Sequence, residues 1–120
     1  SNYAYQYGLP GTFAPIADYD LLSRAVETAK RQGTDVVVGN VLSSDIFYNE
    51  MGNVNDLWRG MGVLAVEMEA AALYMNAAKA GKKALCLLTI SDHLYTGERL
   101  SAEKRQLGFN KMMEIALELA

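Results

Sequence analysis

The chain has 120 residues, of which 51% are apolar, so it can bury a core as one domain or as half of a larger one. Its 14 acidic and 11 basic side chains give a net charge of −3, which disfavours nucleic acid and anionic membranes as partners. No apolar run approaches the ~18 residues that span a bilayer, and a single cysteine with no signal-like start predicts a reduced, cytoplasmic protein.

After a start rich in turn signals at 1–17, helices and strands are predicted to alternate. Caps and apolar periodicity give this order: a helix capped by Asp18 and ended by Gly33, a strand at 35–42, a short helix at 54–61, a strand at 62–66, a helix at 68–79 ended by Gly81, a strand at 83–91, and a helix capped by Ser101. The order predicts an α/β fold with some parallel pairing.

Two of the helices carry apolar stripes that we expect to face the core. The first helix would bury Leu21, Leu22, Ala25, Val26 and Ala29. The last would bury Phe109, Met112, Met113, Ala116 and Leu119.

Polar residues follow two of the predicted strands. The strand at 62–66 is apolar enough to be covered on both faces, and Glu67 and Glu69 come next. Buried carboxylates are costly unless they bind something, and ligands of α/β sheets sit beyond the carboxyl ends of the strands. The strand at 83–91 likewise leads into Asp92. Two such ends side by side favour a polyhydroxylated ligand.

Each of these residues has a structural alternative. Glu67 and Glu69 would complement a helix dipole, or would accept paired hydrogen bonds from ribose hydroxyls. Met68 would pack in the core, or under a sugar ring. Asp92 would cap a turn, or donate a proton. Arg105 would be a solvated charge, or would fold back onto Asp92.

Two aromatic residues also have two alternative roles. Phe47 and Tyr48 would anchor their loop, or stack on a planar heterocycle. We expect His93 to be a structural hydrogen-bonding residue and Cys86 to lie in the core.

Several common sites are absent from the sequence. Neither a G-x-G-x-x-G nor a P-loop motif occurs, and one cysteine and one histidine are too few for a structural zinc. Ser91, Asp92 and His93 cannot form a hydrolase triad, because consecutive residues of an extended chain point to opposite faces. We therefore predict no metal and no cofactor.

The motifs together resemble one family. They are GVLAVEMEAA at 62–71, ISDHL at 90–94, EKRQ at 103–106 and FNKM at 109–112, with FAPIAD at 13–18, Gly39-Asn40 and SDIFY at 44–48 upstream. In this combination they closely resemble the hexameric bacterial-type purine nucleoside phosphorylases, over nearly all 120 residues. VEMEA alone would indicate only the wider nucleoside phosphorylase and nucleosidase superfamily.

The resemblance implies a fold and partners. Residues 1–120 would be the C-terminal half of a single domain, a three-layer α/β sandwich with a mixed sheet flanked by helices. The family is a homohexamer that acts on a purine nucleoside, with phosphate as co-substrate. Its phosphate site lies in the N-terminal half, which is missing here, so we expect this chain alone to be inactive.

The resemblance also implies residue roles in the reversible phosphorolysis of purine ribo- and deoxyribonucleosides. Asp92 matches the general acid at purine N7, and Arg105 the arginine that assists it. The substrate-binding positions are Glu69 at the ribose hydroxyls, Met68 along the sugar, Phe47 beside the base, Ser91 near the base, and Val66 and Glu67 as neighbouring lining residues. The alternatives are a nucleosidase of the same superfamily, which uses water, and a non-catalytic fragment that binds nucleosides or oligomerises.

Overall fold

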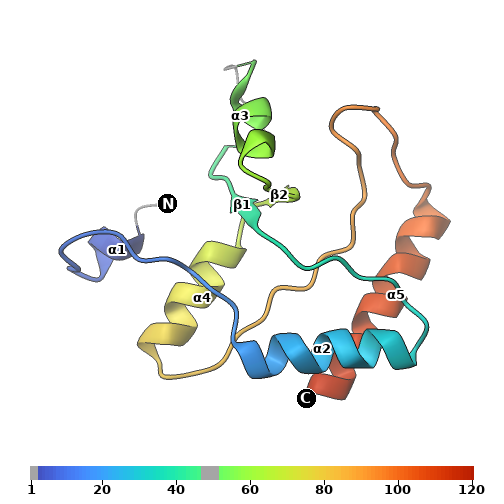
Figure 1. The fold of residues 1–120 in the computed structure, drawn as a ribbon, viewed down its shortest axis with the longest axis horizontal. Coiled ribbons are helices and arrows are strands. Elements are labelled where there is room, and N and C mark those ends of the chain that lie inside the picture. The colour runs from blue at the N-terminus through green and yellow to red at the C-terminus, as the bar shows by residue number, and fades with distance from the viewer. Residues whose placement is uncertain (1–2, 47–51) are drawn as a thin grey trace. The chain divides into compact units, whose positions relative to one another are not determined.

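A computed structural model describes residues 3–46 and 52–120 of the chain. Its elements are α1 (Tyr3–Gln6), α2 (Tyr19–Arg31), β1 (Val41–Ser43), α3 (Val54–Gly60), β2 (Ala65–Glu67), α4 (Ala70–Lys79) and α5 (Ala102–Leu119), as Figure 1 shows. The chain divides into two compact units, Ser1–Asp18 with Val37–Ala84 and Tyr19–Val36 with Leu85–Ala120.

A small parallel sheet organises the first unit. β1 and β2 pair in parallel, with Ser43 opposite Glu67 at their carboxyl ends. The predicted α/β character and parallel pairing are therefore confirmed. α4 begins three residues after β2 and buries Ala70 and Met75.

The strands themselves differ from those predicted. Segments 35–42 and 62–66 contribute only to the short β1 and β2, and 83–91 forms no strand. A strand needs a neighbour that completes its ladder of hydrogen bonds, and most of these residues find none in the part of the chain that the structure describes. The cover expected on both faces is also wrong, because Leu64 is 54% and Val66 41% exposed.

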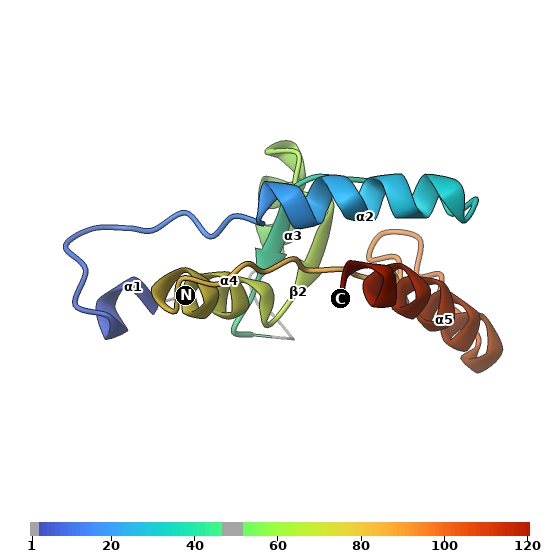
Figure 2. The same ribbon diagram turned by 90° about the horizontal axis from the view of Figure 1, so that it is seen from below.

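The short helix α1 lies beside α4, as Figure 2 shows. Just after α1, the Tyr7 hydroxyl donates to Asn76 Oδ1, and Lys79 Nζ lies 4.5 Å from the centroid of the Tyr7 ring. These contacts attach the segment around Tyr7 to exposed residues of α4.

The second unit has its core between α2 and α5, which pack together. The cluster consists of buried Ala25, Ala29 and Ile115, surrounded by half-buried Leu85, Leu87 and Leu119. The stripe predicted for α2 is confirmed, because Ala25 and Ala29 are its centre.

The stripe predicted for α5 is partly wrong. Phe109, Met113 and Ala116 are exposed. The shielded residues recur every three or four positions and are Arg105, Gly108, Met112, Ile115 and Leu119. Such spacing marks one helical face. The face that packs on the core therefore also carries Arg105.

The predicted cap at Ser101 and the predicted ends at Gly33 and Gly81 are confirmed, whereas α4 begins at Ala70 and not at residue 68, because Glu69 keeps a non-helical conformation as its N-cap. The Ser101 hydroxyl accepts a hydrogen bond from the Lys104 N–H at 3.2 Å, which caps α5. Gly33 (φ +69°) and Gly81 (φ +65°) follow α2 and α4 in the left-handed conformation that glycine adopts without strain.

Candidate functional site

The carboxyl end of the parallel sheet brings Ser43 and Glu67 together. The pairing continues one residue further, where the Ser44 N–H donates to the Glu67 carbonyl at 2.8 Å. The Ser43 hydroxyl donates to Glu67 Oε1 and accepts from the Ala71 N–H at 2.9 Å. One hydroxyl group thus links β1, β2 and α4.

Glu67 caps the first turn of α4. Its Oε2 accepts hydrogen bonds from the N–H groups of Glu69 at 2.6 Å and Ala70 at 2.5 Å. Together with the Ala71 N–H on Ser43, three backbone donors that a helix start leaves without partners are satisfied. A carboxylate also complements the positive end of the helix dipole. The helix-capping alternative is confirmed for Glu67, and its role as a lining residue stays a prediction.

Glu69 has a different environment. Its side chain is exposed and makes no capping hydrogen bond. Within residues 3–46 and 52–120, its carboxylate has neither a hydrogen bond nor an ion pair. Its neighbours Val66 and Met68 are each 41% exposed. All lone pairs of the Glu69 carboxylate therefore remain available to hydroxyl donors of a ligand.

In the second unit, residues 91–100 form a loop that closes on itself. An antiparallel bridge joins Asp92 to Arg99, and the His93 N–H donates to the Glu98 carbonyl at 2.8 Å. The loop therefore holds the backbone of Asp92 at its base.

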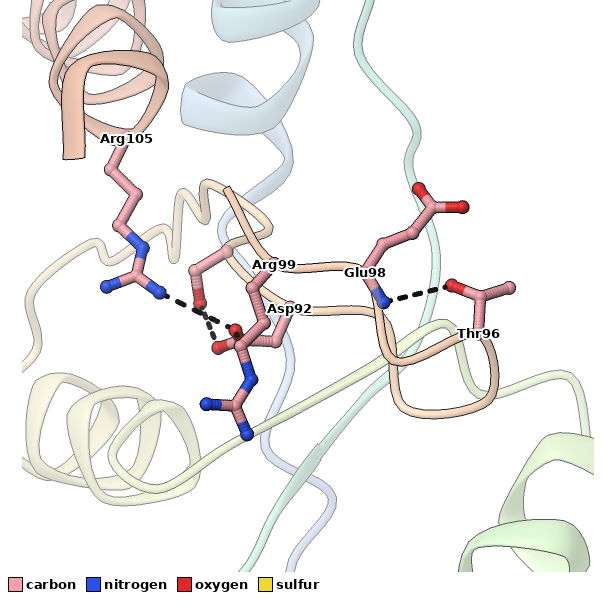
Figure 3. A network of polar contacts seen from close by, with 6 residues as sticks. Asp92, Thr96, Glu98, Arg99 and Arg105 are labelled. Atoms are coloured by element: carbon pink, nitrogen blue, oxygen red, sulfur yellow. Dashed lines mark hydrogen bonds and ion pairs between the residues drawn. The ribbon is translucent and has the colours of Figure 1, made fainter. Parts of the chain in front are cut away.

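His93 stabilises the tip of this loop. Its Nδ1 accepts from the N–H groups of Tyr95 at 3.2 Å and Thr96 at 3.1 Å. The Thr96 hydroxyl in turn accepts from the Glu98 N–H at 3.3 Å (Figure 3). The structural role predicted for His93 is confirmed.

Asp92 lies among three polar side chains, two of them labelled in Figure 3. Its Oδ2 accepts a hydrogen bond from the Ser91 hydroxyl at 2.8 Å. Its Oδ1 is 3.6 Å from Arg105 Nη2 and 3.8 Å from Arg99 Nε. The side chains of Asp92 and Arg105 are 45% and 41% exposed and that of Arg99 is 80% exposed, and such solvated pairs contribute only up to about 1 kcal/mol each. Arg105 therefore does fold back onto Asp92, in an arrangement that small movements can tighten.

The packing of α5 aims Arg105. One turn further along the helix, the Gly108 carbonyl accepts a hydrogen bond from the Thr89 hydroxyl at 3.2 Å. Arg105 Nε is shielded from solvent and has no acceptor within the described residues. The helix therefore carries the guanidinium group toward Asp92, and its shielded Nε–H is left without an acceptor in the part of the chain that the structure describes.

Phe47 and Tyr48 lie outside the described residues, so the place of Phe47 beside a base stays a prediction. Cys86 was predicted to lie in the core, but it is half-buried, between Leu85 and Leu87, which pack against the buried cluster of the second unit.

The family model described as "Phosphorylase superfamily" matches residues 1–119. The chain belongs to the phosphorylase superfamily. Similar proteins, each named "Purine nucleoside phosphorylase DeoD-type", occur in Clostridium novyi (53% identical), Anoxybacillus flavithermus (54%) and Shewanella denitrificans (51%). Each alignment covers 90% of this chain and 46% of the relative. This superfamily member therefore spans about half the length of the curated relatives it matches.

Two residues near the candidate site of this phosphorylase-superfamily chain were not singled out from the sequence. Ser43 acts on Glu67 through strand pairing across 24 positions, and a serine at a strand end gives no signal of that partner. Arg99 reaches Asp92 because the loop closes. Its signal was an arginine placed seven residues after an acid, with the turn residue Gly97 between them.

The described residues of this superfamily member hold neither a metal-binding cluster nor a membrane-spanning helix. Across residues 3–46 and 52–120, no group of three or more His, Cys, Asp or Glu side chains is arranged to hold a metal ion. Among the helices of those residues, none is both long and apolar enough to cross a membrane.

Proposed function

We propose that this chain supplies the purine and ribose sites of a purine nucleoside phosphorylase. The enzyme would convert purine ribo- and deoxyribonucleosides and phosphate, reversibly, into the free base and a pentose 1-phosphate. Relatives that are 51–54% identical over most of the chain carry that name. Within the chain, the observation that carries the proposal is the Asp92 carboxyl group with Arg105 Nη2 3.6 Å away.

Asp92 would be the general acid. A phosphate oxygen forms a bond to C1′ of the sugar while the C1′–N9 bond breaks and its electron pair enters the purine ring. A proton passed from the Asp92 carboxyl group to N7 makes the departing base neutral, as acid assistance does in glycoside hydrolysis. Arg105 then stabilises the carboxylate that remains through charge-assisted contact.

Glu69 would bind the ribose hydroxyls. The support is its exposed carboxylate, which has no partner in residues 3–46 or 52–120. A carboxylate accepts hydrogen bonds from two adjacent hydroxyls at once. Met68 would line the sugar, with Val66 and Glu67 as neighbouring lining residues, and Phe47 and Ser91 would lie near the base.

Phosphate, the co-substrate, would be held by residues of the intact protein that lie outside this chain. Helix N-termini often bind phosphate, but the first N–H groups of α4 already donate to Glu67 and Ser43. Residues 1–120 alone would then be inactive. The intact enzyme would need no cofactor.

The same proposal covers the architecture. Residues 1–120 would be the C-terminal half of one three-layer sandwich domain, whose mixed sheet extends the parallel pair β1 and β2. Leu64, 54% exposed, and Val37, 83% exposed, are the kind of strand residues that such a sheet covers. The intact protein would be a cytoplasmic homohexamer.

The test is phosphate dependence in the intact protein that contains these residues. We expect inosine to yield hypoxanthine and ribose 1-phosphate only when phosphate is present. Turnover with water alone would identify a nucleosidase instead. Tight inosine binding without turnover in either condition would identify a non-catalytic nucleoside-binding protein.

A pair of matched variants tests the general acid. Asp92→Asn should lower kcat by about 10²- to 10⁴-fold, the usual contribution of a positioned proton donor. Asp20→Asn is the control, because Asp20 also pairs with an arginine, Arg24, at 3.8 Å on the surface of α2. Equal activity of the two variants would exclude Asp92 as the acid.

A further inference from the structure

Ser43 and Glu67 form a clamp around the start of α4. The Ser43–Glu67 clamp consists of the Ser43 hydroxyl, the Glu67 carboxylate and the N–H groups of Glu69, Ala70 and Ala71. Its hydrogen bonds to those three donors measure 2.6, 2.5 and 2.9 Å. Both oxygens of Glu67 and both functions of the Ser43 hydroxyl, donor and acceptor, are in use.

The clamp fixes the backbone of Glu69 but leaves its side chain unengaged. Glu69 is the N-cap residue of α4, with φ −129° and ψ −23°. Because this conformation lies outside the helix, the helix itself does not impose it. The bond from the Glu69 N–H to Glu67 Oε2 fixes the orientation of the peptide from which the Glu69 side chain departs. A ligand group held by Glu69 is therefore placed by Glu67 and, one contact further back, by Ser43.

We infer that Ser43 is a positioning residue for sugar recognition. Through Glu67, Ser43 holds the Glu69 carboxylate where this carboxylate accepts hydrogen bonds from the hydroxyl groups of a ribose. The inference rests on the proposed function, since it takes the ligand of Glu69 to be a nucleoside. It assigns the two neighbouring carboxylates different tasks. Glu67 is a scaffold group held by neutral donors, and Glu69 is the group that contacts the sugar.

The test compares two nucleosides that differ only in the groups Glu69 would bind. In the intact protein, Ser43→Ala removes one donor from Glu67 and one acceptor from the Ala71 N–H. We expect the KM for inosine to rise about three- to tenfold, the usual effect of one lost hydrogen bond. The inhibition constant of 2′,3′-dideoxyinosine, which lacks both hydroxyls, should change less than twofold.

Two further variants separate positioning from general loss of structure. Ser44→Ala is the matched control, because the Ser44 hydroxyl bonds to the backbone of Ile46 and not to Glu67. It should leave both constants unchanged. Ser43→Thr keeps the hydroxyl and should restore most of the affinity for inosine. Amide hydrogen exchange at Ala71 should be faster in Ser43→Ala than in Ser44→Ala, because only the first loses the acceptor of that N–H.

Each outcome decides one question. An equal loss for inosine and 2′,3′-dideoxyinosine would overturn the positioning role, because the effect would not depend on the sugar hydroxyls. Unchanged KM for inosine in Ser43→Ala would overturn it as well. If the wild-type protein neither binds nor cleaves inosine while the Ala71 N–H is protected, the proposed function fails and the inference falls with it.

Discussion

Gly108→Ala tests whether the close approach of α5 to Thr89 sets the position of Arg105. A Cβ atom at residue 108 would lie 2.7 Å from Thr89 Cγ2, well inside van der Waals contact. Thr89 cannot simply turn away, because its hydroxyl donates to the Gly108 carbonyl at 3.2 Å. The added methyl group must therefore push α5 outward, and Arg105 lies one turn earlier on the same face.

Two effects of opposite sign determine the magnitude. Overpacking of a well-filled contact costs about 1–3 kcal/mol. Alanine is favoured over glycine inside a helix by about 1 kcal/mol. Gly108→Ala should therefore destabilise the protein by roughly 1 kcal/mol. In a variant without the clash, Gly108→Ala should instead stabilise the protein.

The Thr89→Ser variant removes the clash and is the second background in which Gly108→Ala is measured. Serine keeps the hydroxyl that binds Gly108 and lacks Cγ2, the atom in the clash. Urea unfolding of the intact protein should show Gly108→Ala destabilising with Thr89 present and stabilising in the Thr89→Ser background. The two effects should differ by about 1–3 kcal/mol, the size of the overpacking energy.

Function gives a second readout for the same variants. If the displacement of α5 moves Arg105 from Asp92, kcat for inosine should fall in Gly108→Ala and recover in the double variant. Stabilisation by Gly108→Ala in both backgrounds would refute the reasoning, because it would mean that Thr89 and α5 are not in close contact. Destabilisation without any change in kcat would refute only the link to Arg105.

Other variants test single contacts. Arg105→Ala should lower kcat about fivefold, the roughly 1 kcal/mol of a half-exposed ion pair with Asp92, whereas Arg99→Ala, at an 80% exposed side chain, should change kcat less than about twofold. Equal losses in the two variants would show that overall charge, not position, matters. Ser101→Ala should destabilise the protein by about 0.5–2 kcal/mol through loss of the α5 cap. An unchanged urea midpoint would contradict the cap.

Helices could be predicted from the sequence because their signals are local. Ser101 at the start of α5 and Gly33 after α2 act within a few residues of themselves. The buried face of α5 was harder to predict, since large apolar residues such as Phe109 are exposed while Gly108 is shielded. That face packs on α2 and meets Thr89, and residue type alone does not reveal which partner a helix will meet.

Strands and the clamp depend on distant partners. The apolar run at 83–91 has strand composition, yet a strand exists only beside another strand. Ser43 shows the same limit for a site residue, because its role arises from the register that places it opposite Glu67. The acids were singled out by the cost of a buried carboxylate without a partner, yet Glu69 and Asp92 are exposed and only Glu67 is half-buried.

The partners of the two acids fit the proposal that Asp92, and not Glu67, carries the proton. Every hydrogen bond of the Glu67 side chain uses a lone pair on its carboxylate, and two of the donors are backbone N–H groups that cannot turn into acceptors. A proton on Oε2 would take one of its two lone pairs and displace one of these N–H groups. Asp92 instead meets the Ser91 hydroxyl, which can rotate from donor to acceptor, and two arginine side chains at 3.6 and 3.8 Å. The proposed acid therefore has a partner, the Ser91 hydroxyl, that can follow a proton as it leaves.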